Sequence, residues 1–381
     1  MLSAEPGRAD PPAGVGPTAG RVTVTDLRPS SSDRAAPAPT DLIDAVLVAT
    51  YPTLQDGVRG ANLALRSDGT LVGWGADVAG ETRPPTDLAD VVDVDLAGGF
   101  ALAARSDGSV AAWGGTDSGV LDLPDDLGDV TAVAALGSGG CGYGIALDAD
   151  GTLTQWGGAS CEDAMPYQLP DGLTDVTAVS AGDDAAIALR SDGTVVTWGP
   201  AGRLGFLDGI SPEKWTDVTE VSTQSRTFVG LTADHETVAY GIWGEAGAPV
   251  GVTGVVSVSA GADPAFLRAD GSAYLWPSSS AVLPPTPYIA VVGGLGYVVT
   301  IVPLQPAPTP TAEPTVEPTP TSDPTATTGP PGPTTAPTPP GCTERPRHHP
   351  PHRSWPQRAH PTATSPSAPA ATSTAGPTAV S

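Results

Sequence analysis

The sequence is poor in basic residues. Its 381 residues include 17 lysines and arginines, of which only one is a lysine, against 42 acidic residues, so the net charge is −25. Proteins that bind duplex DNA or RNA use basic side chains to displace counterions from the phosphates. The composition therefore predicts no direct binding of nucleic acid.

The sequence also lacks the pattern of a secretory signal and a long apolar run. Residues 1–7 have no basic stretch followed by an apolar one, so no secretory signal is predicted within this chain. The longest apolar run, 288–302, has 15 residues and contains Gly293-Gly294. A helix that crosses about 30 Å of hydrocarbon needs about 20 residues. We therefore expect two strands here and no membrane span.

The sequence also contains no stretch in which apolar residues recur every 3.6 positions for long enough to indicate a helix. Proline is unevenly placed, because 22 of the 43 prolines follow residue 302. We expect residues 1–40 to be a mostly disordered leader, residues 41–303 to form one folded domain, and residues 304–381 to be a disordered Pro/Thr-rich tail. The basic, histidine-containing stretch at 345–353 is expected to be part of that tail rather than a metal site.

Within the folded domain one pattern recurs six times: an apolar strand, an Asp-Gly turn or its equivalent, a β-branched strand and an aromatic residue six positions after the Asp. Alternating apolar residues around Asp-Gly predict a β-hairpin with a two-residue type I′ turn. That register places Leu63 opposite Trp74. We expect the repeated aromatics to be structural and to pack within or between repeats. They are Trp74, Trp113, Trp156, Trp198, Tyr240 and Trp276.

A further strand precedes each hairpin, as in 173–182, and seven copies of it occur at intervals of 34 to 46 residues. A unit this small leaves an apolar face that only a neighbouring unit covers, and a closed ring protects the strand edges. The sequence thus predicts an all-β, seven-bladed β-propeller, with six blades as the alternative. Residues 20–25 resemble 193–197 and either pair with the last blade, closing the ring, or belong to the disordered leader.

The repeat resembles a known family. The stretch 74–85, followed by 90–94 and 97–102, is similar to the repeat of the regulator of chromosome condensation family. Its Trp-Gly and Gly-x-Thr motifs, at 74–75 and 80–82, are similar to those of bacterial members, whose repeat also has Val-Pro and which include the propeller-type β-lactamase inhibitory proteins. The resemblance covers residues 42–302 and implies a seven-bladed propeller.

Members of this family bind different partners on similar scaffolds, so the resemblance implies protein recognition but no single activity. The eukaryotic member exchanges nucleotide on a small GTPase and docks on nucleosomes, whereas the inhibitory bacterial members use aromatic residues on one rim. The rim positions after Ala-Gly are the predicted partner contacts here. They are Phe100, Tyr143, Asp183, Asp184, Arg226 and Asp263. A ring of aromatics is largely missing, so inhibition of a β-lactamase is not favoured.

Catalytic patterns are weak. His235, the one histidine within the repeats, is expected to be a solvated turn residue. The glycine-rich stretch 137–142 leads into a strand rather than a helix, so it predicts no dinucleotide site. The pairs Asp125-Asp126 and Asp183-Asp184 point to opposite faces of an extended chain, unlike a glycosidase dyad. The sequence thus predicts no catalytic residues, no cofactor and no metal site.

Two of the three cysteines, Cys141 and Cys161, flank one hairpin. With a two-residue turn, strict register places Cys141 opposite Ser160 and turns the two thiols to opposite faces, although the glycines nearby leave a disulfide feasible. A disulfide and two free thiols are therefore both open. A disulfide would indicate an oxidising, extracytoplasmic compartment.

Together these patterns predict a monomeric, non-enzymatic, protein-binding propeller that recognises its partner through rim loops. Its predicted location is extracellular or at the cell surface, on a Pro/Thr-rich stalk, with the cytoplasm as the alternative. Three other functions stay open: inhibition of a secreted enzyme, guanine-nucleotide exchange, and a carbohydrate-active enzyme that uses rim carboxylates.

Overall fold

The computed structural model divides the chain into two compact units, Met1–Thr311 and Ala312–Ser381. The structure describes residues 19–27, 32–115, 117–138, 141–159, 167–199, 215–224, 227–241, 252–261, 263–276, 283, 286–294 and 296–304, all in the first unit. The predicted tail after residue 304 and the first 18 residues of the predicted leader lie outside the described residues. Every regular element in the described part is a strand, and no described helix is long and apolar enough to cross a membrane.

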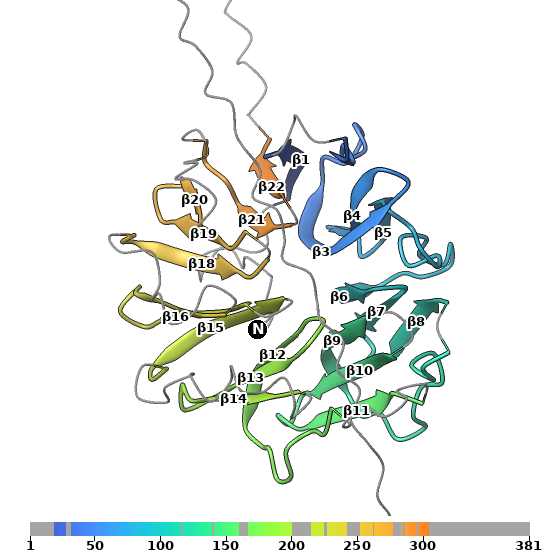
Figure 1. Cartoon of the computed structure of the whole chain (residues 1–381). Helices are drawn as coiled ribbons and strands as arrows, with labels where there is room; N and C mark the ends of the chain where they lie inside the picture. The colour runs from blue at the N-terminus through green and yellow to red at the C-terminus, as the bar shows by residue number, and fades with distance from the viewer. Residues whose placement is uncertain are drawn as a thin grey trace, which may run out of the picture. The chain divides into compact units, whose positions relative to one another are not determined.

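Most strands form separate three-stranded antiparallel sheets, each from one stretch of sequence (Figure 1). The described residues contain five such sheets. They are β6 (Val91–Ala97), β7 (Phe100–Arg105) and β8 (Val110–Gly114); β9 (Val130–Ser138), β10 (Cys141–Asp148) and β11 (Leu153–Gly157); β12 (Val176–Ala181), β13 (Ala186–Arg190) and β14 (Val195–Trp198); β15 (Val218–Gln224), β16 (Thr227–Thr232) and β17 (Thr237–Tyr240); and β18 (Val255–Ser259), β19 (Ala265–Arg268) and β20 (Ala273–Leu275).

The remaining strands form one seven-stranded sheet that contains two more antiparallel sets of three. The first set is β3 (Ala45–Gln55), β4 (Val58–Arg66) and β5 (Leu71–Gly75), and the closing set is β21 (Ala290–Gly293), β22 (Tyr297–Pro303) and β1 (Gly20–Asp26). A single residue pair, Gly20 opposite Ala45, joins β1 to β3. The short strand β2 (Arg34–Ala35) pairs in parallel with β4.

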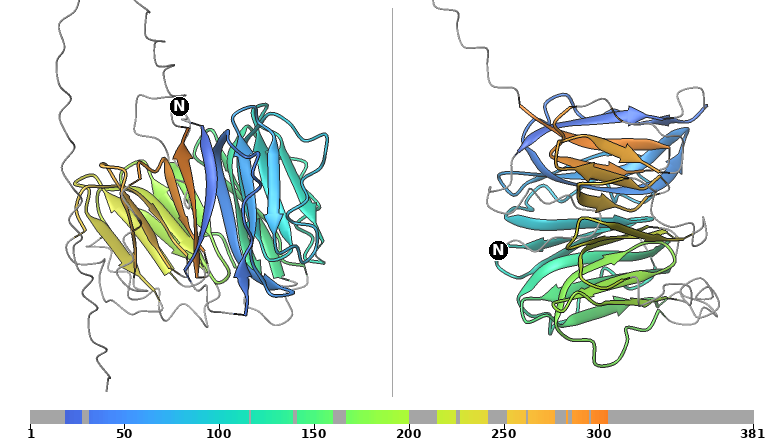
Figure 2. Two further views of the ribbon diagram at one scale, coloured as in Figure 1. Left: turned by 90° about the horizontal axis from the view of Figure 1, so that it is seen from above. Right: turned by 90° about the vertical axis from the view of Figure 1, so that its left-hand side faces the viewer.

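The sets follow one another around a central axis. The first strand of each set contacts the first strand of the next, in the order β3, β6, β9, β12, β15, β18 and β21, and β21 returns to contact β3. Figure 1 looks along this axis, and Figure 2 shows the same strands from the edge. The all-β propeller predicted from the repeats is therefore confirmed. The count of seven blades stays a prediction, because two of the sets share one sheet.

The ring is closed by strands from the two ends of the folded region. β1 pairs with β22 along its whole length, from Gly20 opposite Pro303 to Asp26 opposite Tyr297. Val22 and Ile301 are both buried in the core between the closing and first sets. Residues 20–25 thus form the ring-closing strand that their similarity to 193–197 suggests.

The middle strand of each set is almost completely buried, because neighbouring sets cover both of its faces. In β7 every residue from Phe100 to Ala104 is at most 1% exposed. In β7 three of the six residues are alanines, and their small side chains allow adjacent sheets to pack closely there.

The hairpins differ from the prediction by one residue. Leu65 pairs with Leu71, and Arg66 N donates to Thr70 O, so the loop is Ser67–Gly69 rather than Asp68-Gly69 alone. Of these loop residues only Gly69 has a positive φ, 79°, whereas a type I′ turn needs two. The predicted type I′ turn is therefore wrong, and Trp74 lies opposite Asn62 instead of Leu63. The loop fits a type I turn followed by a left-handed residue.

Candidate protein-binding surface

The antiparallel strands give the ring two faces with different connections. We call the face that carries the repeated Asp-Gly turns the turn face, and the face that carries the connections from the first to the second strand of each set the loop face. The turn face is uniform, since a backbone N–H at the start of one set donates to the turn glycine of the set before it. The donors are Val91, Val130, Val176, Val218 and Tyr288, and the acceptors are Gly69, Gly108, Gly151, Gly193 and Gly271.

The turn face is also negatively charged. In five turns the Asp carboxylate accepts the hydroxyl and backbone N–H of a Thr or Ser two residues later, which lowers the pKa of that Asp. These carboxylates stay ionised well into the acidic range. They are Asp68, Asp107, Asp150, Asp192 and Asp270.

The two aromatic contacts predicted on the rim are buried. Phe100 is 1% exposed and Tyr143 is 7% exposed. A Cβ on Gly142 would lie 2.6 Å from the Phe100 ring, so Phe100 packs directly under the neighbouring set. Both residues begin or lie near the start of a middle strand, whose faces are covered on both sides. Their burial contradicts the predicted role in partner contact.

The predicted acidic contacts organise the loop face from within. Tyr51 OH donates to Asp183 Oδ1, and Tyr167 OH donates to Asp183 O at 2.9 Å. Burial, reinforced by the Asp183 carboxylate, raises the pKa of Tyr51. Asp263, which is 3% exposed, accepts Gly296 N at 3.2 Å.

Asp184 is likewise buried, at 7% exposed, so neither it nor Asp263 is an accessible contact. Asp183 is half-buried. Arg226 lies outside the described residues. Of the six predicted contacts, then, the structure leaves only Asp183 partly accessible among those it describes.

The repeated tryptophans link neighbouring sets, as a structural role requires. The indole Nε1 of Trp113 donates to Glu81 O at 2.9 Å, and that of Trp156 donates to Val120 O at 2.8 Å. Trp198 Nε1 donates to Gln155 Oε1 at 2.9 Å. Each acceptor belongs to the preceding repeat. Trp74 is also buried, while Tyr240 and Trp276 are half-buried.

Polar side chains of the first strands hold adjacent sets together around the axis. Asp93 Oδ2 accepts Val133 N at 2.9 Å, and Glu220 Oε1 accepts Val258 N at 3.1 Å. Ser222 Oγ accepts Ala260 N at 2.8 Å. First strands are sheet edges, so these side chains satisfy N–H groups that no strand pairs with. Sequence reasoning missed this role, although the alternating Asp-Val-Asp, Glu-Val-Ser and Ser-Val-Ser patterns mark it.

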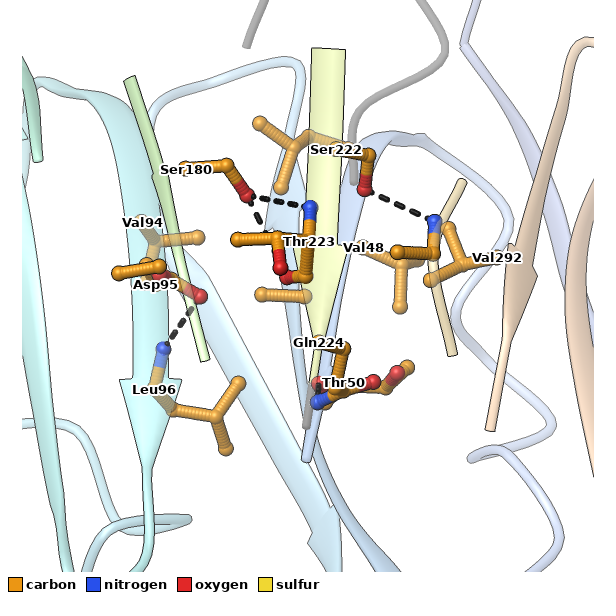
Figure 3. Close-up of a pocket in the computed structure, with 14 residues that line it drawn as sticks. Val48, Thr50, Val94, Asp95, Leu96, Ser180, Ser222, Thr223, Gln224 and Val292 are labelled. Atoms are coloured by element: carbon orange, nitrogen blue, oxygen red, sulfur yellow. Dashed lines mark hydrogen bonds between the residues drawn. The ribbon is translucent and has the colours of Figure 1, made fainter. Parts of the chain in front are cut away.

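The first strands also enclose a cavity of about 40 Å³ on the axis (Figure 3). Its polar lining comes from Thr50, Asp95, Ser180, Ser222, Thr223 and Gln224. Such a volume holds a few water molecules but not a sugar ring. Burial raises the pKa of Asp95 to about 7, although Ala135 N and Leu96 N donate to its carboxylate at 2.9 and 2.8 Å. Asp95 is the one carboxylate in this lining.

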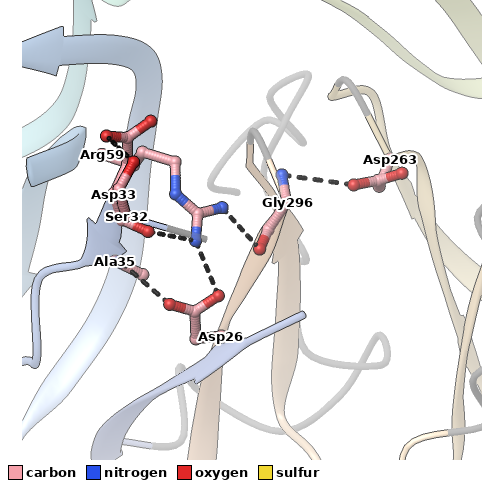
Figure 4. A network of polar contacts seen from close by, with 7 residues as sticks. All are labelled: Asp26, Ser32, Asp33, Ala35, Arg59, Asp263 and Gly296. Carbon is pink, nitrogen blue, oxygen red and sulfur yellow. Dashed lines mark hydrogen bonds and ion pairs between the residues drawn. The ribbon is translucent and has the colours of Figure 1, made fainter. Parts of the chain in front are cut away.

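A polar network anchors the first set to the ring closure (Figure 4). The Arg59 side chain, 4% exposed, donates to Asp26 Oδ1 at 2.7 Å and to Gly296 O at 2.9 Å. It also donates to Asp33 O at 3.1 Å. The guanidinium therefore joins β4, the strand β1, the segment before β2 and the turn before β22.

Two remaining predictions concern cysteine and histidine. Cys141 is disulfide-bonded. Cys161, its predicted partner, lies outside the described residues. The observed register pairs Tyr143 with Gly157, one residue away from the register expected from a two-residue turn. His235 takes the place of the turn glycine with φ 62°, and its Nδ1 lies 2.9 Å from Val255 O.

No group of three or more His, Cys, Asp or Glu side chains within the described ranges is arranged to hold a metal ion. Asp183 and Asp184, one of the two Asp-Asp pairs in the sequence, make contacts within the protein. Asp183 is bonded to Tyr51, and Asp184 is buried. The polar side chains described in this section thus form contacts within the protein, and they lie beneath loops that differ from set to set.

Comparison with known proteins agrees with this architecture. The regulator of chromosome condensation (RCC1) repeat matches residues 176–199. No curated protein sequence matches the chain significantly. The fold is similar to that of Prp20p from Saccharomyces cerevisiae, with 15% identity, a TM-score of 0.56 and coverage of 76% of this chain and 93% of that chain. The Prp20p structure is described together with binding to Gsp1p and histones.

The ectodomain of the Physcomitrella patens receptor kinase CR4 is 19% identical, with a TM-score of 0.53 and coverage of 68% of this chain and 71% of that chain. Human WBSCR16 is 14% identical, with a TM-score of 0.50 and coverage of 74% and 99%. Likeness at these identities concerns the fold. The comparisons therefore show one segment, residues 176–199, that is similar to the regulator of chromosome condensation repeat, and a propeller fold similar to that of Prp20p.

Proposed function

We propose that the protein is a non-enzymatic platform that binds another protein through its loop face. The observation that supports this proposal is the contrast between the two faces of the ring. One backbone hydrogen bond recurs at five junctions of the turn face, whereas the loop-face connections differ in length and sequence. Variable loops on a rigid scaffold suit recognition.

The other functions receive less support. A carbohydrate-active enzyme needs two carboxylates that face each other across a cleft, but the axial cavity is small and has a single carboxylate in its lining. Inhibition through rim aromatics is disfavoured because Phe100 and Tyr143 are buried. Nucleotide exchange is supported only by the family resemblance. Binding to Gsp1p and histones is described for Prp20p and not for this chain.

The proposed location is outside the cytoplasm. The disulfide at Cys141 supports it, because disulfides persist in oxidising compartments. A strongly acidic surface further favours a neutral or basic protein partner over nucleic acid.

The test is in-cell cross-linking of the tagged full chain, followed by mass spectrometry and titration of each candidate with purified protein. We expect saturable binding of a partner with a defined stoichiometry. Reaction of the purified chain with a glycan panel is the matched control. Glycan hydrolysis, or the absence of any saturable protein partner, would show the proposal to be wrong.

A further inference from the structure

Asp-Gly pairs occur at seven places in the described residues, five of them in the repeated turns and two outside those turns. The outside pairs are Asp56-Gly57, at the tip of the hairpin of β3 and β4, and Asp171-Gly172, in the segment before β12. An eighth pair, Asp208-Gly209, lies outside the described residues. Asp-Gly is prone to spontaneous rearrangement, because glycine has no side chain to hinder attack of its backbone nitrogen on the Asp carboxyl group.

The rearrangement begins when the glycine nitrogen attacks Cγ of the protonated carboxyl group. A C–N bond forms, the C–O bond to the hydroxyl breaks, and a water molecule leaves with the amide proton, which gives a cyclic succinimide. Water then adds to one of the two ring carbonyls. Cleavage at the main-chain carbonyl yields isoaspartate, whose backbone is longer by a methylene group, and cleavage at the side-chain carbonyl restores Asp. Water is the only co-reactant, but the Gly N–H and the carboxyl group must both be free to meet.

In the five repeated turns both groups are already engaged. The glycine N–H donates to the carbonyl three residues earlier, as Gly69 N does to Arg66 O at 3.0 Å, and this bond is 2.9–3.0 Å long in all five turns. The carboxylate accepts bonds from Thr or Ser, as Asp68 does from the Thr70 hydroxyl at 2.6 Å and from Thr70 N at 3.0 Å. These bonds lower the pKa of each turn Asp, which keeps the reactive protonated form scarce.

The next set restricts the same glycines further. Its first backbone N–H donates to the carbonyl of each turn glycine at 3.0–3.1 Å. A Cβ built on Gly69 would lie 3.1 Å from Asp90 Cα, and one on Gly271 would lie 2.7 Å from Pro287 Cα. The Asp-Gly peptide therefore has little room to rotate toward the carboxyl group.

The two pairs outside the repeated turns lack most of these restraints. Asp56 and Asp171 are exposed, and neither carboxylate has a hydrogen-bond or ion-pair partner within the described residues. Gly57 N and Gly172 N donate to no acceptor in the part of the chain that the structure describes, and a Cβ on either glycine would meet nothing within 4 Å. The bond from Arg34 N to Gly57 O, at 2.9 Å, engages neither reacting group.

We propose that Asp56 and Asp171 are the sites at which the described part of the chain forms isoaspartate, and that the repeated turns protect the other five Asp-Gly pairs. Exposure alone does not separate the two classes, since Asp68 is exposed as well. The inference is independent of the proposed function.

The two sites differ in what the rearrangement changes. Asp56 and Gly57 have φ of 50° and 77°, as a two-residue type I′ turn requires. A methylene group added to this turn should break the bond from Arg34 N to Gly57 O and free β2 from β4. At Asp171 the change falls in the connection between β11 and β12.

The test is incubation of the full chain in water enriched in the heavy oxygen isotope, because every succinimide that hydrolyses takes up a labelled oxygen atom. One sample stays folded and another is unfolded in guanidinium chloride. Peptide mass spectrometry then measures the label, and the fragment ions specific to isoaspartate, at each Asp-Gly pair. In the unfolded chain all pairs should react at similar rates.

Folding should slow the five turn pairs by about tenfold or more, because the hydrogen bonds at each turn must break first. The rates at Asp56 and Asp171 should stay within about threefold of their unfolded values. Equal labelling of all seven described pairs in the folded chain would overturn the proposal. So would the absence of labelled isoaspartate at Asp56 and Asp171.

Thr70→Val is the matched variant, since it removes the hydroxyl bond to Asp68 and keeps the branched shape of the side chain. We expect labelling at Asp68 of the folded variant to rise by about threefold, while labelling at Asp107 stays unchanged. No rise at Asp68 would contradict the protective role of the turn hydrogen bonds. Asp56→Ser should abolish the label at that turn, which verifies its assignment, and label that persists there would exclude Asp56 as its source.

Discussion

The junction that closes the ring and the junctions between ordinary repeats are held by different interactions. At the ordinary junctions an indole N–H reaches an acceptor in the preceding repeat, as for Trp113, Trp156 and Trp198. At the closing junction Trp74 Nε1 has no hydrogen-bond partner in the described structure. There the buried Arg59–Asp26 pair links the first set to the closing set, within which β1 pairs with β22.

The closing set differs from the other sets in where its strands come from. β21 and β22 belong to residues 290–303 and β1 to residues 20–26, so side chains such as Thr23 and Thr300 meet at 2.6 Å across 277 residues. The backbone ladder between β1 and β22 therefore holds together a set whose strands are not consecutive in sequence.

The largest expected effect is from removing the closing strand. Deletion of residues 1–27 exposes the edge of β22 and the core around Val22, so we expect the melting temperature to fall by about 10 °C or more. Deletion of residues 1–18, which leaves β1 intact, is the control and should change it little. Equal melting curves for the two deletions would show that the ring does not depend on this strand.

At an ordinary junction, Trp156→Ala should cost about 3–5 kcal/mol in the free energy of unfolding. The substitution empties a buried site and removes the bond to Val120 O. Chemical denaturation measures this loss, and Trp156→Phe should recover most of it. A loss below about 1 kcal/mol would contradict the structural role of the repeated tryptophans.

Asp26→Ala should cost about 3 kcal/mol, because it leaves the buried Arg59 guanidinium without its carboxylate. Asp44→Ala is the comparison, since Asp44 pairs with Arg66 at 3.2 Å in a more exposed position. That surface pair should contribute about 1 kcal/mol or less. The same denaturation experiment compares the two, and similar losses would remove the distinction between the closing junction and the surface.

The smallest effect concerns Asp95, at an ordinary junction. Its pKa is raised to about 7 in the folded protein, against about 3.9 in an unfolded chain. The folded state thus holds a proton that the unfolded state releases, so this group lowers stability as pH rises toward 7. Between pH 5 and pH 8 we expect a loss of about 2 kcal/mol.

Asp95→Asn should flatten this part of the stability profile. The measurement is the midpoint of urea unfolding at each pH for the two proteins. Parallel profiles would show that Asp95 titrates in its ordinary range. Asp68→Asn, in an exposed turn, is the control and should leave the profile between pH 5 and 8 unchanged.

The repeats allowed the fold to be predicted, but not the fine geometry of the site. Periodic Asp-Gly turns and aromatics are local signals, and they indicated small stacked sheets. The similarity of residues 20–25 to 193–197 left a closing strand and a disordered leader both open. The turn type was predicted wrongly because Asp-Gly occurs both in a two-residue turn and in a three-residue loop. Only the φ angle of the Asp distinguishes these two turn types. The one-residue difference in register was enough to change the residue opposite Trp74.

Four of the six predicted rim contacts are buried, for a different reason. A residue that directly follows Ala-Gly is expected near the loop face. Its place in the sequence does not decide whether a neighbouring repeat covers its side chain, and in Phe100 the side chain is covered. The buried network of Arg59 and Asp26 joins residues 33 positions apart and carries no periodic signal. The same holds for the exposed hairpin of β3 and β4, which departs from the repeat.

The pairing of β1 with β22 also sets an order of events during synthesis. β1 emerges first, yet its partner is complete only when residue 303 has left the ribosome, after every repeat has been made. Until then β1 and the open flank of the first set have no partner, and closure must bring together ends more than 270 residues apart. Intervening repeats that have already folded shorten the effective distance and lower the entropic cost of closure. A chain interrupted before β22 therefore exposes an unpaired strand at its N-terminus, where a chaperone or protease can recognise it as unfinished.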